Sequence, residues 1–191
     1  MTDFNELMGE LLELGVTAIP DMPYTASVLD RSGQILVTAC NAVHISPLYT
    51  AESLAMHVLA NEFDCRPDQP LTLIATAELD ESSLQAIYRA RHHGIYITEL
   101  VSGASREDIQ AIWSCDPNRP LQEALKQFPD EFRNSLILHD PVLQTDCRQA
   151  FIDGHQLWAD KLAPVKSWNL EQYWMTGDWL QDEWDELELG E

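Results

Sequence analysis

The chain is poor in basic residues. Only 11 of its 191 residues are lysine or arginine, against 32 aspartate and glutamate residues, so the formal net charge at pH 7 is −21. A surface this acidic repels the phosphate backbone of nucleic acids and the headgroups of anionic lipids. We therefore expect no direct binding to nucleic acid or to a membrane. Because only three of the basic residues are lysines, adaptation to high salt is an alternative explanation for part of the acidity.

Long apolar runs and paired cysteines are also missing. No window approaches the roughly 20 consecutive apolar residues that a membrane-spanning helix needs. The first 15 residues are acidic and amphipathic, whereas a secretory signal begins basic and continues apolar. The four cysteines, which form no CxxC pair, are Cys40, Cys65, Cys115 and Cys147. Scattered cysteines are typical of free thiols in a reducing compartment, so we expect a cytoplasmic protein.

The residues that are present have the periodicity of an α/β protein. Apolar spacing predicts helices over residues 3–14, 51–63, 81–91, 105–113, 121–128 and 146–162. Short β-prone runs predict strands over residues 24–29, 35–39, 71–75, 95–97 and 136–138. The first two strands are separated by a turn-forming tetrapeptide and should form a hairpin. This order predicts a three-layer α/β/α domain with a central mixed sheet.

Two glycines and one proline mark the expected ends of elements. Gly15 follows the first helix and Gly94 follows the helix over 81–91, where C-caps are expected. Pro164 divides the chain into a domain over 1–163 and an acidic extension over 164–191. The last 27 residues contain four of the six tryptophans and eight acidic residues against one lysine. So much aromatic surface predicts docking, either on the chain's own domain or on a partner.

Several short motifs stand in order along this pattern. They are PYTA at 23–26, Asn41 after the hairpin, PLYTAE at 47–52 and TAELDESS at 76–83. From Pro23 to about Leu157, this arrangement resembles the cytidine deaminase-like superfamily of nucleobase and nucleoside deaminases. It is most similar to the branch of bacterial tRNA adenosine deaminases and guanine deaminases. The resemblance implies the three-layer fold of that superfamily.

Members of this superfamily are zinc enzymes. One His and two Cys hold the zinc ion, whose bound water becomes hydroxide near neutral pH, and a Glu that is not a ligand transfers protons. The resemblance implies that Glu52 is this glutamate and that Asn41 is the asparagine that contacts the substrate. It places Thr50, Asp80 and Ser83 at the three metal-ligand positions. The resemblance therefore implies that all three zinc ligands are replaced and that Glu52 is a vestigial proton shuttle.

The replacements are poor ligands for zinc, so we expect no metal cofactor. Threonine and serine hydroxyls stay protonated at neutral pH, and one carboxylate cannot supply the roughly four donors that zinc needs. Glu52, Glu78 and Asp80 could instead form an oxygen-rich site, which would favour Mg²⁺ or Ca²⁺. Zinc would need unrecognised ligands, and the candidates are Cys40, His44 and His57.

The same residues also have structural explanations. Glu52 lies in the first turn of a helix, where the macrodipole favours a carboxylate. Asp80 and the serines after it have the composition of a helix N-cap, and Asn41 could satisfy loop backbone groups. A basic cluster at a helix end either compensates the dipole or binds an anion. Its members are Arg89, Arg91, His92 and His93.

Three functions are compatible with these features. The favoured one is a catalytically inactive deaminase-like protein that acts in binding, assembly or regulation. It would form a homo-oligomer or pair with an active deaminase, and it could hold a nucleoside-like molecule through Asn41 and Glu52. The alternative is a deaminase or related hydrolase with a rewritten, non-zinc site built on Glu52, Glu78 and Asp80. A DNA mimic or acidic scaffold is supported only by the charge.

Overall fold

A computed structural model describes residues 2–43, 45–46, 49–62, 69–113 and 118–166. The chain separates into two units, Met1–Leu157 and Trp158–Glu191. The fold described below is that of the first unit. Most of the predicted extension over 164–191, including its tryptophans, lies outside the described residues. Within the described residues, every helix is too short or too polar to cross a membrane.

The predicted hairpin and the helices around it are present. The strands are β1 (Thr25–Leu29), β2 (Ile35–Cys40), β3 (Pro70–Ala77), β4 (Tyr96–Ala104) and β5 (Ile137–Leu138). The larger helices are α1 (Phe4–Ala18), α2 (Ala51–Glu62), α3 (Glu81–Ala90) and α7 (Gln144–Lys166). Three shorter helices are α4 (Arg106–Ile112), α5 (Leu121–Leu125) and α6 (Asp130–Asn134). A 3-10 turn over Arg91–His93 follows α3 and ends at Gly94. This glycine is the predicted C-cap, and its φ of 79° lies in the left-handed region that glycine adopts easily.

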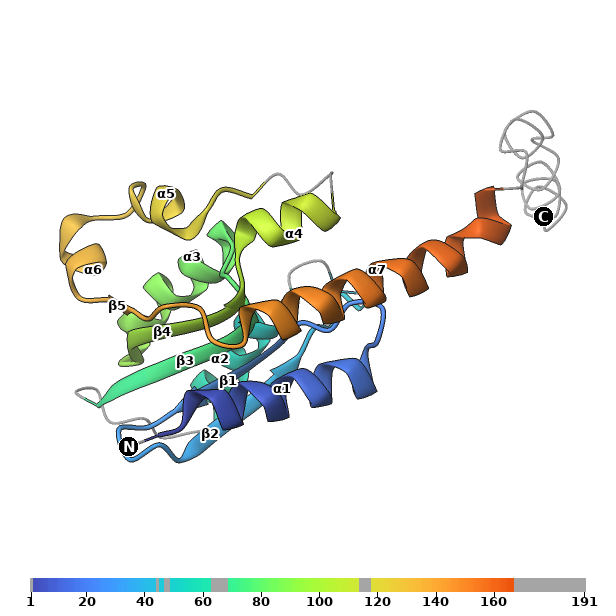
Figure 1. Ribbon diagram of the computed structural model, residues 1–191. Coiled ribbons are helices and arrows are strands. Elements are labelled where there is room, and N and C mark those ends of the chain that lie inside the picture. Colours follow the sequence, from blue (N-terminus) through green and yellow to red (C-terminus); the bar gives the residue numbers. More distant parts are fainter. Residues whose placement is uncertain (1, 44, 47–48, 63–68, 114–117, 167–191) are drawn as a thin grey trace, which may run out of the picture. The chain divides into compact units, whose positions relative to one another are not determined.

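The sheet is mixed, as predicted. Its order is β2-β1-β3-β4-β5, in which β1 runs antiparallel to both β2 and β3, while β3, β4 and β5 run parallel. One face is covered by α1 and the first turns of α7, and the other by α2, α3 and α5 (Figure 1). Leu7, Met8 and Phe151 pack on the first face, and Leu59, Leu84 and Ile87 on the second. This is the three-layer α/β/α architecture.

Some helix and strand boundaries differ from the prediction, because tertiary packing outweighs the local sequence pattern there. Gly15 does not end α1, which continues to Ala18. Glycine is needed at position 15 for a different reason, because a Cβ there would meet the Pro23 carbonyl oxygen at 2.7 Å. β4 is nine residues long rather than three, since it pairs with β3 along most of its length. The last strand, expected to be buried, is an edge strand on which Ile137 is 57% exposed.

Candidate functional site

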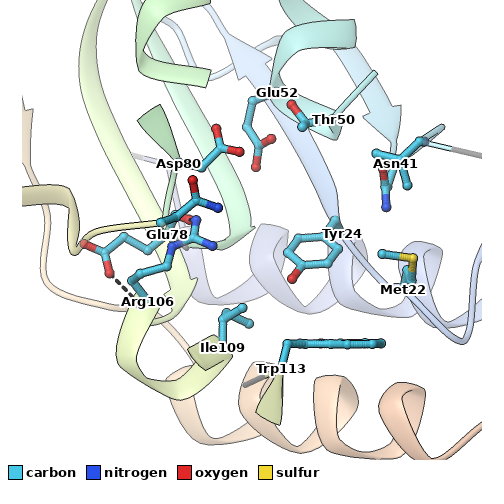
Figure 2. Close-up of a pocket in the computed structure, with 12 residues that line it drawn as sticks. Met22, Tyr24, Asn41, Thr50, Glu52, Glu78, Asp80, Arg106, Ile109 and Trp113 are labelled. Carbon is cyan, nitrogen blue, oxygen red and sulfur yellow. Dashed lines mark hydrogen bonds between the residues drawn. The ribbon is translucent and has the colours of Figure 1, made fainter. Parts of the chain in front are cut away.

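A cavity opens where several helices and strands meet at one end of the sheet. Its volume is about 320 Å³. It lies at the carboxyl ends of β3 and β4, beside the N-termini of α2, α3 and α4 (Figure 2). The lining residues are Met22, Tyr24, Asn41, Val43, Thr50, Glu52, Glu78, Asp80, Arg106, Ile109, Trp113 and Asn118. The structure thus gathers most of the predicted site residues around one hollow.

Two of the three expected metal-ligand positions cap helices. The Asp80 side chain is the N-cap of α3, and its Oδ1 accepts from the Ser83 backbone N–H at 2.6 Å. The Thr50 hydroxyl precedes α2 and accepts from the Ser53 backbone N–H at 3.2 Å. These bonds satisfy donors that a helix start leaves without partners. The predicted cap role of Asp80 is confirmed.

The side chains at the expected ligand positions also contact one another. Thr50 Oγ1 lies 3.3 Å from Ser83 Oγ, in hydrogen-bonding geometry. Ser83 Oγ donates to Glu52 Oε2 at 3.2 Å. Figure 2 shows the carboxyl groups of Glu52 and Asp80 pointing into the same end of the cavity. Thr50 Oγ1 also donates to Ser53 Oγ at 3.1 Å, so the contacts among Thr50, Ser83 and Glu52 form a polar cluster that connects the N-termini of α2 and α3.

This donor set does not fit zinc. The three positions that the sequence resemblance assigned to metal ligands hold two alcohols and one carboxylate, whose Oδ1 already caps a helix, whereas zinc prefers imidazole and thiolate ligands. In the part of the chain that the structure describes, no three His, Cys, Asp or Glu side chains are grouped so that they could hold a metal ion. The chemistry of these residues is that of a hydrogen-bonded junction.

Glu52 has an unusual electrostatic environment. Its side chain is 5% exposed. Burial raises the pKa of its carboxyl group, and the nearby charge of Asp80 raises it further, while hydrogen bonds from Thr50 and Ser83 act in the opposite direction. A carboxyl group with a raised pKa holds its proton at a higher pH than an ordinary glutamate. Glu52 is thus biased toward the neutral acid.

Glu78 is occupied by backbone groups. Its Oε2 accepts from the Arg106 N–H at 2.6 Å and its Oε1 from the Leu121 N–H at 2.7 Å. The Arg106 guanidinium donates to the Glu78 carbonyl oxygen. Glu78 therefore holds the starts of α4 and α5 together. It does not join Glu52 and Asp80 in the oxygen-rich cluster considered from the sequence, because both of its oxygens are already engaged.

Asn41 enters the cavity from the end of the hairpin. It is 4% exposed, its backbone N–H donates to the Tyr24 carbonyl at 2.9 Å, and its Oδ1 accepts from the Val43 N–H at 3.2 Å. Its amide group points toward the cavity in Figure 2. Within the described residues, Asn41 Nδ2 makes no hydrogen bond. Asn41 can therefore serve both proposed roles. Its Oδ1 satisfies a loop backbone group, while its Nδ2 remains available to contact a ligand.

The other candidates from the sequence lie elsewhere. His57 is exposed on α2 and its backbone carbonyl accepts from Asn61, and Cys40 is partly buried outside the cavity lining. His44, Cys65 and Cys115 lie outside the described residues. In the basic cluster, Arg91 stacks 4.6 Å from the Phe132 ring centroid and donates to Ser135 Oγ. Its charge therefore serves local packing.

Sequence reasoning missed the apolar side of the cavity. Met22, Ile109 and Trp113 line it together with the Tyr24 ring. The ring centroids of Tyr24 and Phe151 lie 4.5 Å apart, and those of Trp113 and His155 also lie 4.5 Å apart. The residues on α4 could not be assigned from a motif, because they reach the cavity only through tertiary packing. The capping box that begins α4, Ser105 with Asp108, was the available signal.

Solved structures share this arrangement of strands and helices. A guanine deaminase from Nitrosomonas europaea matches with a TM-score of 0.64 and 18% identity, over 82% of this chain and 86% of that one. The chain has the cytidine deaminase-like fold. A tRNA:A34 deaminase structure matches with a TM-score of 0.55 and 16% identity, over 76% and 99% of the two chains. Aspergillus oryzae Rib2 deaminase gives 0.54 and 15%, over 82% and 95%.

Sequence comparison finds neither a matching protein-family model nor a matching curated protein. The similarity to these solved structures is therefore one of fold, at sequence identities of 15 to 19%.

Proposed function

We propose that this chain is a catalytically inactive deaminase-like protein that acts by binding and needs no metal cofactor. One observation carries the proposal: two of the three positions where the superfamily holds zinc are taken by the hydroxyls of Thr50 and Ser83, which contact each other, and Ser83 also donates to Glu52. Without a metal, the site has no group that turns water into hydroxide at neutral pH. Glu52, the glutamate that transfers protons in that chemistry, here accepts a hydrogen bond from Ser83 Oγ, and burial raises the pKa of its carboxyl group.

The alternative function is a deaminase or hydrolase with a rewritten carboxylate site. General acid–base catalysis by carboxyl groups needs at least one that is free to accept a proton from water or substrate. Glu78 is engaged by two backbone amides, and Asp80 Oδ1 caps α3. This leaves Glu52, with a raised pKa, and the second oxygen of Asp80. The binding function therefore has more support.

A partner for this protein is also a proposal. Two apolar side chains in the loop between β2 and α2 are exposed, Ile45 at 70% and Tyr49 at 38%. Contiguous exposed apolar patches mark interaction surfaces, and these two side chains are where we would look for one. We expect a homo-oligomer, or a complex with an active deaminase, in the cytoplasm. Sedimentation velocity of the purified chain, alone and mixed with such an enzyme, measures either association.

Metal content combined with turnover tests the proposed function. The full chain is purified without chelators or a metal-binding tag, its transition metals are measured by mass spectrometry, and it is incubated with guanine, adenosine and cytidine. We expect less than one tenth of an equivalent of zinc and no ammonia release. Stoichiometric zinc with turnover would contradict the proposal and restore deamination as the function.

A restored ligand set provides the positive control. Ligands of a tetrahedral zinc ion lie about 3.5 Å apart, given bond lengths of about 2.0 to 2.3 Å. Thr50 and Ser83 already approach to 3.3 Å. We expect the triple variant Thr50→His, Asp80→Cys and Ser83→Cys to bind one zinc ion, while the natural chain binds none. The matched control is Ser32→Cys, Asp30→Cys and Thr38→His, which adds the same residues to the hairpin, away from the cavity.

A further inference from the structure

The cavity lining carries more negative than positive charge. Its carboxyl groups are those of Glu52, Glu78 and Asp80, and its guanidinium group is that of Arg106. Glu78 and Arg106 are bound to each other through main-chain and side-chain groups. For Glu52 and Asp80, the described residues supply no ion pair with a lysine, arginine or histidine. Two neighbouring carboxyl groups therefore face the hollow without a cation.

The opposite wall of the cavity is aromatic and apolar. Figure 2 shows Trp113, Ile109 and Met22 across the hollow from Glu52 and Asp80, with the Tyr24 ring between the two groups. Contacts with Phe151 and His155 hold the Tyr24 and Trp113 rings in place. Aromatic faces carry partial negative charge and attract cations. This wall therefore favours a flat ligand and adds to the preference for positive charge.

A third group in the cavity lacks a partner. Asn41 is 4% exposed and its Nδ2 makes no hydrogen bond to any described residue, although it points toward the cavity. Among the described residues Nδ2 is not one of the buried side-chain atoms that lack a partner, so it is open to the cavity, where water or a ligand can accept its N–H groups. Asn41 thus offers a donor to an occupant that places a hydrogen-bond acceptor or a π-face near this amide.

We propose that this cavity binds a small, flat organic cation, with a protonated amino or amidino group directed at Glu52 and Asp80. The inference rests on the proposed function, because a zinc ion at this end would itself balance the carboxyl groups. A protonated amidine presents two parallel N–H donors, which match a carboxylate better than a neutral amide does. The cation replaces the positive charge that the superfamily obtains from its metal.

Two probes of nearly equal shape test the charge preference. Benzamidine is a cation at pH 7.5, whereas benzamide has the same ring and is neutral. Binding of each to the full chain is measured by isothermal titration calorimetry at 0.1 M salt. We expect benzamidine to bind about tenfold more tightly or better, as is typical of charge-assisted hydrogen bonds. Equal affinities, or no detectable binding of benzamidine, would overturn the proposal.

Three variants locate the site. Asp80→Asn removes a carboxylate and Glu52→Gln removes an ionisable carboxyl group, both with little change in side-chain shape, and asparagine remains a good N-cap. We expect each to reduce the preference for benzamidine to less than threefold. Glu10→Gln makes the same charge change on the exposed face of α1 and should leave the preference intact. If Asp80→Asn fails to fold by circular dichroism, Glu52→Gln carries the test. A preference that survives in both cavity variants would overturn the assignment.

Metal content of the same preparation separates the two proposals. Failure of benzamidine to bind to a zinc-free chain would overturn the cation site and leave the inactive-deaminase proposal standing. Stoichiometric zinc in the preparation would overturn the proposed function itself, whatever the probes do.

Discussion

At the scale of single residues, Glu52 makes stability depend on pH. Burial and the charge of Asp80 raise the pKa of its carboxyl group above the ordinary value of 4.5. Because the folded chain holds this proton more tightly than the unfolded chain, the contribution is fully present below that ordinary value. It is lost as the pH rises through the pKa of the folded state. Glu52 therefore destabilises the fold in its ionised form.

The variant Glu52→Gln tests this dependence. Glutamine keeps an acceptor for the Ser83 hydroxyl and cannot ionise. We expect the variant to match the natural chain at pH 4 and to become increasingly more stable than it by pH 8. Urea denaturation at pH 4, 6 and 8 measures the free energies of unfolding, with Glu10→Gln as the exposed control. A difference that does not change with pH would contradict the raised pKa.

Two variants of Asp80 distinguish its contribution as a helix N-cap from the effect of its negative charge. Asp80→Ala and Asp80→Asn both remove the carboxylate next to Glu52, but only asparagine can accept from the Ser83 N–H as Asp80 does. We expect the alanine variant to be less stable than the asparagine variant by about 1 kcal/mol, the usual contribution of an N-cap. Urea denaturation at one pH gives the difference. Equal stability of the two variants would show that the cap contributes nothing.

At the scale of elements, Glu78 joins α4 and α5 to the end of β3. Glu78→Ala would leave the N–H groups of Arg106 and Leu121 without the acceptor they now share. We expect a loss of roughly 2 to 4 kcal/mol, because hydrogen bonds to charged groups are the strong ones. Hydrogen exchange should accelerate first at the starts of α4 and α5. Glu107→Ala, on the exposed side of α4, is the control and should leave exchange there unchanged.

The elements also show how far the sequence could be interpreted. The hairpin, α2 and α3 were predictable because turn residues and helix caps, such as Asp80, are local signals. β4 was predicted too short because its C-terminal half contains serine and glycine. Gly103 is required there, since a side chain would meet Cys147 Sγ at 2.4 Å and the Thr76 carbonyl oxygen at 2.5 Å. That requirement comes from neighbours distant in sequence.

For the candidate site too, the residues in local motifs were predictable, and the contacts between residues distant in sequence were not. Motifs located Asn41, Thr50, Glu52, Asp80 and Ser83, and the structure brings the last four together. The motifs could not show that Glu78 faces two backbone amides, or that Trp113 closes the opposite wall. Both depend on where α4 and α5 pack, and no local pattern specifies that.

At the scale of the whole molecule, the net charge of −21 should make the stability of the fold depend on salt concentration. Repulsion among like charges destabilises a compact chain, and it acts over a Debye length of about 10 Å at 0.1 M salt and 3 Å at 1 M. Screening should therefore stabilise this protein, whereas a chain with balanced charges would gain little or lose ion pairs. The few ion pairs among the described residues are mostly exposed, as for Arg119–Glu81, and their loss costs little.

We expect the Tm to rise by about 4 °C or more between 0.05 and 1 M sodium chloride, since 1 kcal/mol corresponds to about 2 to 4 °C for a chain of this size. Differential scanning calorimetry at five salt concentrations measures it. Most of the rise should come below about 0.3 M, because the Debye length has already fallen by then. A rise that begins only above this concentration would point to general salting-out instead. An unchanged Tm would show that the acidic residues are spaced widely enough to avoid repulsion, and that the charge serves solubility alone.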